Sequence, residues 1–305
     1  MLTSVESDHQ DYYPTYESIR DAFVEYALSL PEGGVLVYCA DDPGATEVAA
    51  LAAAKRADLV LVPYGFSAEG SWHIGSYRAA DERARFTIAA FDGEFALRVP
   101  GRHLALDACA AVALAALVRA DLDGLPPSEA PRAARAFLPA LKAGLEGFSG
   151  SRRRSEILGE AGGVVFMDDY GHHPTAIRTT LRGLKEFYPR RRLVVDFMSH
   201  TYSRTKALLD EFAASLADAD AVWLHRIFAS AREVPDGTVD GRTLYERTAA
   251  LRPEVRYVEE PLDAVDDIAA SLRPGDLFIT MGAGDNYLAG RAVFERFKAR
   301  KGGKA

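Results

Sequence analysis

Titratable side chains gather in one short stretch of the sequence, FMDDYGHHPTAIRTTL at residues 166–181. Asp169, Tyr170, His172 and His173 follow the apolar run GGVVF and precede a pattern typical of a helix. Such side chains can move protons or orient a reacting group, and open α/β sheets bind ligands at the carboxyl ends of their strands. This turn is the first candidate site. The alternative is a solvated loop whose carboxylates cap the helix.

Two further loops follow predicted strands in the same way. In SHTYSRT, residues 199–205, His200 and Arg204 could together hold a carboxylate, because a guanidinium pairs with both carboxylate oxygens. The alternative there is a helix start capped by Ser203, with a solvated arginine. In GAGD, residues 282–285, glycines could let backbone amides approach a phosphate or carboxylate, although a lone GxG is more often a tight turn.

Other polar residues are more scattered. His9, in ESDH, has carboxylates beside it and could ligate a hard cation such as Mg or Mn. Arg153 and Arg154, in GSRRRSE, form either a solvated run or a group that neutralises phosphate charge. His73 and His225 have no evident partner and are predicted to be packing or surface residues.

The elements that must position these residues indicate the α/β class. Short apolar strands are predicted to alternate with helices, which favours parallel sheets. The predicted strands are residues 35–40, 59–66, 163–169, 192–198, 221–227 and 276–282. Residues 70–100 instead alternate with period two around a turn at Asp92–Gly93, which predicts antiparallel strands. Pro174 is expected to open a helix whose apolar face carries Ile177, Leu181, Leu184 and Phe187.

Size and composition limit the class of protein. The 305 residues suffice for two ordinary domains, and the Pro-, Gly- and Arg-rich stretch before GSRRRSE predicts a boundary near residue 150, giving domains 1–150 and 151–305. The formal net charge of -8 argues against a broad nucleic-acid or membrane surface and favours small-molecule partners. The polar N-terminus does not resemble a signal peptide. The apolar run 108–118 is expected to be a core helix, and Cys39 and Cys109 are expected to be structural, which suits the cytoplasm.

The order of the motifs DDYGHHP, HTYSRT and GAGD resembles the Mur ligases. The similarity extends through IFASARE and, upstream, through ESDHQDYY, YCADDPG, PYGFS, VPGRH and FSGSRRR. It is greatest to the members that use ATP to join L-alanine to UDP-N-acetylmuramate through an acyl phosphate in peptidoglycan synthesis. The resemblance implies an α/β protein, with part of the central ATPase domain in residues 1–150 and a Rossmann-like C-terminal ligase domain in residues 151–305.

The resemblance also implies roles for individual residues. Tyr170 and His172 would face the reaction centre, and His200 and Arg204 would orient the alanine carboxylate. The remaining implied contacts are Asp169 to the ATP ribose, Arg153 and Arg154 to the phosphates, His103 and Asp107 near the adenine, and His9 to a divalent cation such as Mg. Leu104 and Asp107 stand where many family members carry asparagine, so the chain departs from the family pattern at the adenine contacts.

The family's phosphate loop, G-x-x-x-x-G-K-[ST], is not found in these residues. The expectation is therefore a truncated ligase that is inactive by itself and that associates with a missing N-terminal half or with itself. Three alternatives remain: a non-catalytic binding module, half of a split ligase, or a fragment of the muropeptide-recycling ligase. A dinucleotide-dependent oxidoreductase is disfavoured, because GAGD lies too near the chain end to open a Rossmann unit.

Overall fold

The computed structural model describes residues 1–7, 12–80, 82–229, 233 and 237–302. The chain divides into two compact units. Unit 1 consists of Met1–Arg98 and Arg102–Phe148, and unit 2 runs from Ser149 to the carboxyl end and includes Val99–Gly101. The short segment belongs with unit 2 because helix α6 (Pro174–Phe187) packs tightly on it: a Cβ atom at Gly183 would lie 2.6 Å from the Cα atom of Gly101.

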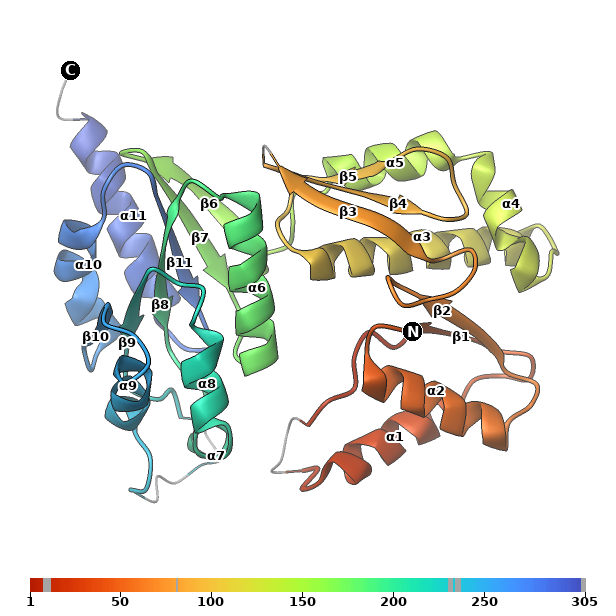
Figure 1. Cartoon of the computed structure of the whole chain (residues 1–305), viewed down its shortest axis with the longest axis horizontal. Helices are drawn as coiled ribbons and strands as arrows, with labels where there is room; N and C mark the ends of the chain where they lie inside the picture. Colours follow the sequence, from red (N-terminus) through yellow and green to blue (C-terminus); the bar gives the residue numbers. More distant parts are fainter. Residues whose placement is uncertain (8–11, 81, 230–232, 234–236, 303–305) are drawn as a thin grey trace. The chain divides into compact units, whose positions relative to one another are not determined.

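Unit 1 is built around a long helix that contacts two small sheets (Figure 1). Strands β1 and β2 pair in parallel, and β3, β4 and β5 form an antiparallel sheet, as the period-two pattern predicts. The elements of unit 1 are α1 (Tyr16–Leu28), β1 (Val35–Cys39), α2 (Pro43–Lys55), β2 (Val60–Tyr64), β3 (Ile74–Ala80), β4 (Arg83–Ile88), β5 (Phe95–Leu97), α3 (Arg102–Leu122), the 3-10 helix η1 (Pro127–Glu129), α4 (Ala130–Arg135) and α5 (Leu138–Gly147).

Helix α3 is the core helix of unit 1. It is longer than the apolar run in its sequence, and its buried face is largely alanine, which lets it lie close to both sheets. Among the described residues, it is the one helix long and apolar enough to cross a membrane by length and composition, a test that buried core helices also pass, and half of its apolar window is buried. Cys39 and Cys109 are free and buried, and burial raises the pKa of the Cys109 thiol to about 12.

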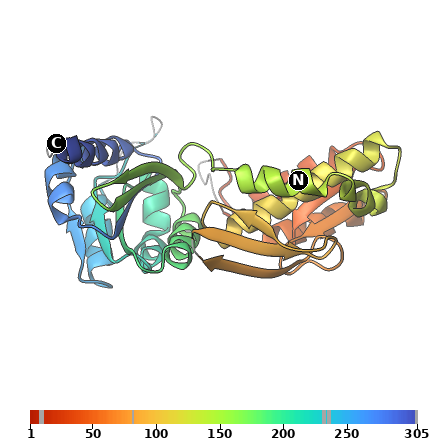
Figure 2. The ribbon, with the colours of Figure 1, turned by 90° about the horizontal axis from the view of Figure 1, so that it is seen from above.

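Unit 2 is a six-stranded sheet in the order β10-β9-β8-β11-β7-β6, with all pairs parallel except β6 with β7. Helices α10 and α11 cover one face, and α6 and α8 cover the other (Figures 1 and 2). The elements are β6 (Glu156–Ala161), β7 (Val164–Asp169), α6 (Pro174–Phe187), β8 (Arg192–Phe197), α7 (Tyr202–Ala207), α8 (Leu209–Ser215), β9 (Ala221–Leu224), α9 (Gly241–Ala249), β10 (Val255–Tyr257), the 3-10 helix η2 (Pro261–Ala264), α10 (Val265–Ser271), β11 (Asp276–Met281) and α11 (Tyr287–Gly302).

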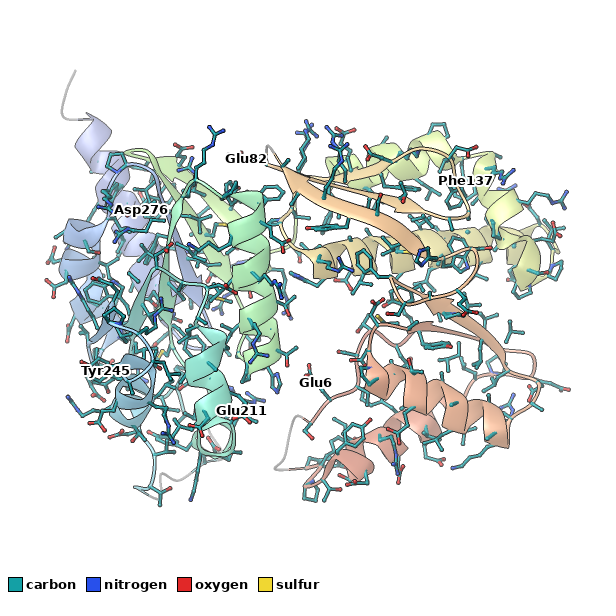
Figure 3. All side chains as sticks on the ribbon, in the orientation of Figure 1. Glu6, Glu82, Phe137, Glu211, Tyr245 and Asp276 are labelled. Atoms are coloured by element: carbon teal, nitrogen blue, oxygen red, sulfur yellow. The ribbon has the colours of Figure 1, made fainter. Side chains whose placement is uncertain are left out.

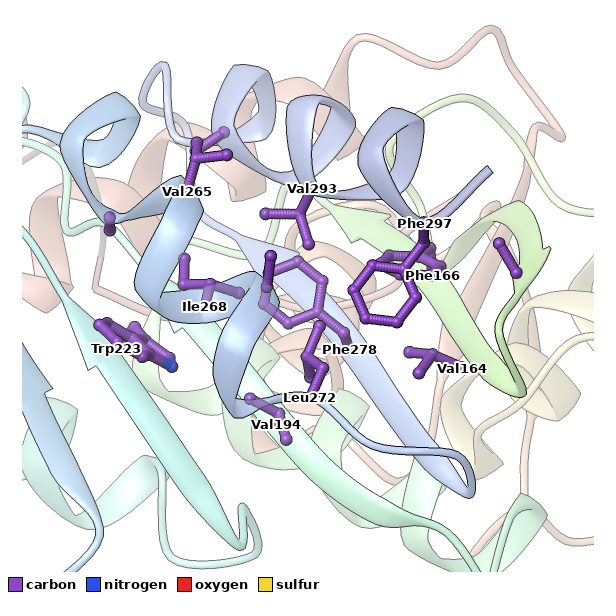
Figure 4. Close-up of a cluster of buried hydrophobic side chains, with 14 residues drawn as sticks. Val164, Phe166, Val194, Trp223, Val265, Ile268, Leu272, Phe278, Val293 and Phe297 are labelled. Atoms are coloured by element: carbon purple, nitrogen blue, oxygen red, sulfur yellow. The ribbon is translucent and has the colours of Figure 1, made fainter. Parts of the chain in front are cut away.

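The core under α10 and α11 is aromatic at its centre (Figure 4). Phe166 of β7 lies with its ring centroid 6.0 Å from Phe278, 4.9 Å from Phe294 and 5.3 Å from Phe297. Burying a phenylalanine side chain contributes roughly 2–3 kcal/mol. Phe166 and Phe278 are register partners in β7 and β11 and face the same side of the sheet, so this packing holds the two strands against α11.

The amino ends of the parallel strands form one border of the sheet, the amino edge, and their carboxyl ends form the opposite border, the carboxyl edge. The two borders differ in character. At the amino edge, Arg192 donates to both carboxylate oxygens of Asp276 at 3.0 and 2.8 Å, and Asp276 is 1% exposed (Figure 3). That ion pair joins the starts of β8 and β11. The polar residues that the sequence analysis singled out lie at the opposite, carboxyl edge.

The predicted α/β class is confirmed, and each of the six predicted apolar strands is present. The strand predicted at 221–227 ends earlier, at Leu224. Strands β6 and β10 were missed. β6 is an edge strand with an exposed Ile157 and a register irregularity between Ile157 and Gly159, so it does not read as an apolar run. Pro174 opens α6 and all four residues of its predicted apolar face are buried, which confirms that helix.

Candidate active site at the carboxyl edge of the sheet

The loops that carry the three motifs meet at one edge because their strands end at the same level. Met281 of β11 is in register with Asp169 of β7 on one side and with Phe197 of β8 on the other, and Phe197 is in register with Leu224 of β9. Since β6 runs antiparallel to β7, the residues that precede β6 also reach this edge. One edge therefore gathers four loops and the start of a fifth strand.

Asp169 organises the turn after β7. Its Oδ2 accepts hydrogen bonds from the amide and hydroxyl of Ser155 at 2.7 and 3.2 Å, and its Oδ1 accepts from the amide of Gly171 at 2.6 Å. The side chain is 5% exposed, and burial raises its pKa, against the effect of these hydrogen bonds. Asp169 therefore ties the turn to the segment before β6, and its contact with a ribose remains a prediction.

Asp168 and Arg153 form a largely buried ion pair, with Arg153 Nε 3.0 Å from Asp168 Oδ2. Arg153 also donates to the carbonyl of Gly282 at 2.9 Å, and its guanidinium carbon lies 5.0 Å from the Tyr170 ring centroid and 4.6 Å from that of Tyr287. Burial raises the pKa of Asp168, partly offset by Thr280 and Arg153. The solvated-run alternative is thus wrong for Arg153.

Arg154 differs from its neighbour. Its side chain is exposed, and its guanidinium carbon lies 5.6 Å above the Tyr170 ring. The cation–π attraction orients a guanidinium over an aromatic ring and leaves it accessible to an anion. Of the two arginines predicted to bind phosphate, Arg154 is exposed, whereas Arg153 is paired with Asp168; the phosphate contact of each remains a prediction.

A row of rings links three of the loops. The ring centroids of Tyr170 and His172 are 5.2 Å apart, those of His172 and His200 are 6.1 Å apart, and those of His200 and Phe228 are 5.9 Å apart. The structure thus brings His200, predicted to orient the alanine carboxylate, next to Tyr170 and His172, predicted to face the reaction centre. The Nδ1 atom of His172 lies 3.0 Å from the Tyr170 carbonyl, and since a carbonyl oxygen only accepts, Nδ1 carries the proton of this hydrogen bond.

His173 has a local role that the sequence analysis did not predict. It is the N-cap of α6, and its Nδ1 accepts from the amide of Thr175 at 3.4 Å. The alternative in which carboxylates cap this helix is wrong, because a histidine does so and both aspartates are engaged elsewhere. The adjacent histidines therefore face different tasks: His172 points to the ring row, and His173 stabilises the helix start.

The loop after β8 has an unusual backbone. Thr201 is the N-cap of α7 with φ +70°, and its side chain makes no capping hydrogen bond. The alternative in which Ser203 caps the helix is also wrong: the Ser203 hydroxyl donates to Glu233, a residue of the segment after β9. His200 lies immediately before this bend and Arg204 follows it in α7.

In GAGD, the glycines are explained by packing. Gly282 has φ +122°, and a Cβ atom there would lie 2.2 Å from the carbonyl oxygen of Met198. A Cβ atom at Gly284 would lie 2.5 Å from the Met198 sulfur. These contacts favour the tight-turn interpretation over a phosphate-binding one.

A buried polar network lies beneath the loop after β8. His225 Nε2 is 2.9 Å from Asp196 Oδ2 and its Nδ1 is 2.8 Å from the Val258 carbonyl, while Asn286 donates to Asp196 Oδ1 at 2.7 Å. Burial lowers the pKa of His225, but the charge and hydrogen bond of Asp196 outweigh it, and the pKa is raised overall. The sequence indicated no partner for His225, and the structure gives it two; the residue is buried, in agreement with the packing prediction.

The remaining candidates lie in unit 1. His103 and Asp107 are in α3, where burial lowers the pKa of His103 and Asp107 raises it. His9 lies outside the described residues. Among the residues that the structure does describe, no group of three or more His, Cys, Asp or Glu side chains could hold a metal ion.

Two family models match the chain in succession. Residues 1–115 match the Mur ligase middle domain, and residues 153–284 match the Mur ligase glutamate ligase domain. The second match contains the loops after β7 and β8 and most of the loop after β11. The chain belongs to the Mur ligase family. The expected resemblance is thereby confirmed.

Individual relatives agree with this assignment. This Mur ligase chain is 51% identical over 299 residues to UDP-N-acetylmuramate–L-alanine ligase of Treponema pallidum, covering 98% of this chain and 60% of the relative. The crystal structure of UDP-N-acetylmuramate-alanine ligase from Thermotoga maritima matches with TM-score 0.69 and 24% identity, over 97% of this chain and 58% of that one. MurF ligase from Thermotoga maritima in complex with ADP matches with TM-score 0.63 and 16% identity, over 100% and 62%. The chain thus spans about 60% of the length of the curated relative.

In this Mur ligase chain, several residues of the site were missed by sequence reasoning. Three residues contact the site from other loops: Glu233 accepts from the amide of Tyr202, Phe228 packs beside His200, and Tyr287 lies against Arg153. None of them was predicted from the sequence as a site residue. The motif IFASARE contained Phe228 and Glu233, and its place after a predicted strand was the available signal. Nothing in the sequence indicated Tyr287.

Proposed function

We propose that this chain carries the amino-acid side of an ATP-dependent ligase that joins L-alanine to UDP-N-acetylmuramate in peptidoglycan precursor synthesis. The observation that carries the proposal is the meeting of His172 and His200, with ring centroids 6.1 Å apart, at the carboxyl edge of the sheet. The 51% identity to a relative of that name supports the choice of substrates. A cytoplasmic location and the absence of nucleic-acid or membrane partners belong to the same proposal.

The loop after β8 would receive the amino acid. Arg204 pairs with the alanine carboxylate and His200 orients it, which holds the amine near the acyl carbon and lowers the barrier by proximity. Tyr170 and His172 face the reacting atoms from the neighbouring loop. With Nδ1 held by the Tyr170 carbonyl, the Nε2 atom of His172 is the atom that accepts or returns a proton.

The nucleotide side of the proposal follows the family resemblance. ATP, when bound with Mg, supplies the phosphoryl group that turns the muramoyl carboxylate into an acyl phosphate. Arg154, accessible above Tyr170, neutralises phosphate charge. Arg153 contacts the rings of Tyr170 and Tyr287 and holds them in place. Asp169 at the ribose, His103 and Asp107 near the adenine, and His9 at the cation complete the proposed set.

The 305 residues include no phosphate loop, so we propose that they do not catalyse ligation alone. A segment of another chain that carries the loop would complete the site, and self-association of this chain is the second proposed partnership. A split ligase, a fragment of the muropeptide-recycling ligase and a non-catalytic binding module remain the alternatives.

The test is ADP release with UDP-N-acetylmuramate, L-alanine, ATP and Mg, using this chain alone and with a separately expressed N-terminal half of a related ligase. We expect turnover in the mixture only. His172→Ala should then lower kcat by about 100-fold or more, whereas the matched variant His173→Ala, which removes the N-cap of α6, should leave kcat within about threefold. Turnover by the chain alone would contradict the half-site proposal, and silence of an associated mixture would favour the binding module.

A further inference from the structure

Thr201 adopts a backbone conformation that a β-branched residue avoids. Its φ of +70° and ψ of 136° place it in a region that is nearly reserved for glycine. Three contacts hold it there. Its amide donates to the Phe228 carbonyl at 3.0 Å, and its carbonyl accepts from the amide and hydroxyl of Thr205 at 3.1 and 2.7 Å.

The next two amides of the chain are held by a single carboxylate from a distant segment. Glu233 Oε2 accepts from the amide of Tyr202 at 2.9 Å, and Oε1 accepts from the amide of Ser203 at 3.0 Å and from its hydroxyl. A carboxylate that accepts three hydrogen bonds fixes the direction of both peptide groups. The bend at Thr201 is thus clamped on its carboxyl side by Glu233.

The strained bend separates the two residues proposed to hold the alanine carboxylate. His200 lies directly before it, and Arg204 lies three residues after it. If Thr201 returned to negative φ, the direction of the chain between His200 and Arg204 would change, and so would their relative position. Strained backbone persists where surrounding contacts over-determine it, and it concentrates at functional sites.

We propose that Glu233 is a positioning residue that holds the strained bend at Thr201 and so sets the relative position of His200 and Arg204 for amino-acid binding. The inference rests on the proposed function of this loop. It implies that the loop has two states, a clamped state that binds the amino acid and a relaxed state that does not. Glu233 shifts the population towards the clamped state.

The proposal predicts an unusual double-mutant cycle. Glu233→Ala should raise KM for L-alanine about tenfold with little change in kcat, because only a fraction of molecules keeps the binding-competent bend. Thr201→Gly alone should raise Tm and leave KM unchanged, since glycine accepts the bend without strain. The double variant should recover KM to within about threefold of the wild type.

Thr201→Gly should lessen the effect of Glu233→Ala on KM but increase its effect on Tm. In the wild-type background, losing the clamp lets the strain at Thr201 relax, which offsets part of the loss. In the Thr201→Gly background there is no strain to release, so Glu233→Ala should lower Tm by more. Rescue of KM together with a larger fall in Tm is the signature of positioning. A merely structural glutamate would lower Tm in both backgrounds and leave KM alone.

The experiment is this four-variant cycle on the full chain, with Tm and amide hydrogen exchange measured on the chain itself and alanine KM measured in the mixture with the N-terminal half. Glu211→Ala, which removes an exposed carboxylate of α8, is the matched control and should change neither KM nor exchange (Figure 3). Exchange of the Tyr202 and Ser203 amides should accelerate about tenfold or more in Glu233→Ala.

The outcomes separate the two proposals. If the mixture shows no turnover, the proposed function fails, and the cycle is then decided by the NMR signals of the His200 ring, which should shift in Glu233→Ala and return in the double variant. Unchanged amide exchange in Glu233→Ala would overturn the clamp. A raised KM that Thr201→Gly does not restore would overturn the link between strain and binding.

Discussion

The loops after β7 and β8 lie side by side at one edge of the sheet, yet they are held in opposite ways. The loop after β7 is stabilised by nearby residues. Asp169 accepts hydrogen bonds from the amide of Gly171, two residues later, and from the amide of Ser155, directly before β6. The loop after β8 holds a strained residue, Thr201, and depends on Phe228 and Glu233 from after another strand. The comparison shows that the carboxylates of the first motif stabilise its own turn, whereas the second motif, with fewer charged residues, contains the strained residue.

The largest expected effect concerns the network beneath the loop after β8. His225→Gln should lower the free energy of unfolding by about 4 kcal/mol, because it leaves Asp196 buried without its ionic partner. The pKa of His225 is raised in the folded state, so its contribution is fully present below its ordinary pKa of about 6.5 and is lost as pH rises through the raised value. Urea unfolding from about pH 6 to pH 9 should therefore show the difference between wild type and variant shrinking. A difference that grows with pH would contradict the assigned pair.

The second effect breaks the contact between GAGD and the end of β8. Gly282→Ala should cost about 3 kcal/mol, because its Cβ atom would meet the Met198 backbone and φ is +122°. Gly275→Ala is the matched control: it also has positive φ but nothing within 4 Å, and should cost about 1 kcal/mol. Equal costs in denaturant unfolding would show that backbone strain alone explains the need for glycine in this turn.

The third sharpens the difference between two adjacent arginines. Arg153→Met should destabilise the chain by about 2–3 kcal/mol, because it leaves Asp168 buried and unpaired by charge. Arg154→Met, at an exposed side chain, should stay within about 0.5 kcal/mol. In the mixture with the N-terminal half, Arg154→Met should raise KM for ATP more than Arg153→Met does, although it costs less stability. Similar stability losses would refute the division of roles.

The smallest effect tests the cap of α6. His173→Ala should lower the free energy of unfolding by about 0.5–1 kcal/mol, since the hydrogen bond to Thr175 is long. His173→Asn should recover most of that loss, because asparagine is a strong N-cap. Thermal unfolding measures both. No loss on His173→Ala would mean that the amide of Thr175 is satisfied by solvent.

Much of unit 2 was predictable from the sequence because its strands are apolar on both faces and its helices are periodic. Ile177, Leu181, Leu184 and Phe187 lie on one face by spacing alone, and all are buried. β6 escaped prediction because it is an edge strand paired on one side only, so its sequence need not be apolar. The place of the candidate site followed from a general property of parallel sheets, that their loops meet at the carboxyl edge.

By itself the sequence determined which residues could do chemistry, that three loops would bring them together, and which family the motifs resemble. The tertiary structure decided which of those residues are engaged within the fold. Asp169 and Arg153 look reactive in sequence, but Asp169 is held by Ser155, just before β6, and Arg153 is paired with Asp168 of β7. Thr201 looks ordinary, yet Phe228 and Glu233 hold it in strain. The physical reason is common to both: hydrogen bonds and ion pairs between strands depend on register and packing, which no local stretch of sequence specifies.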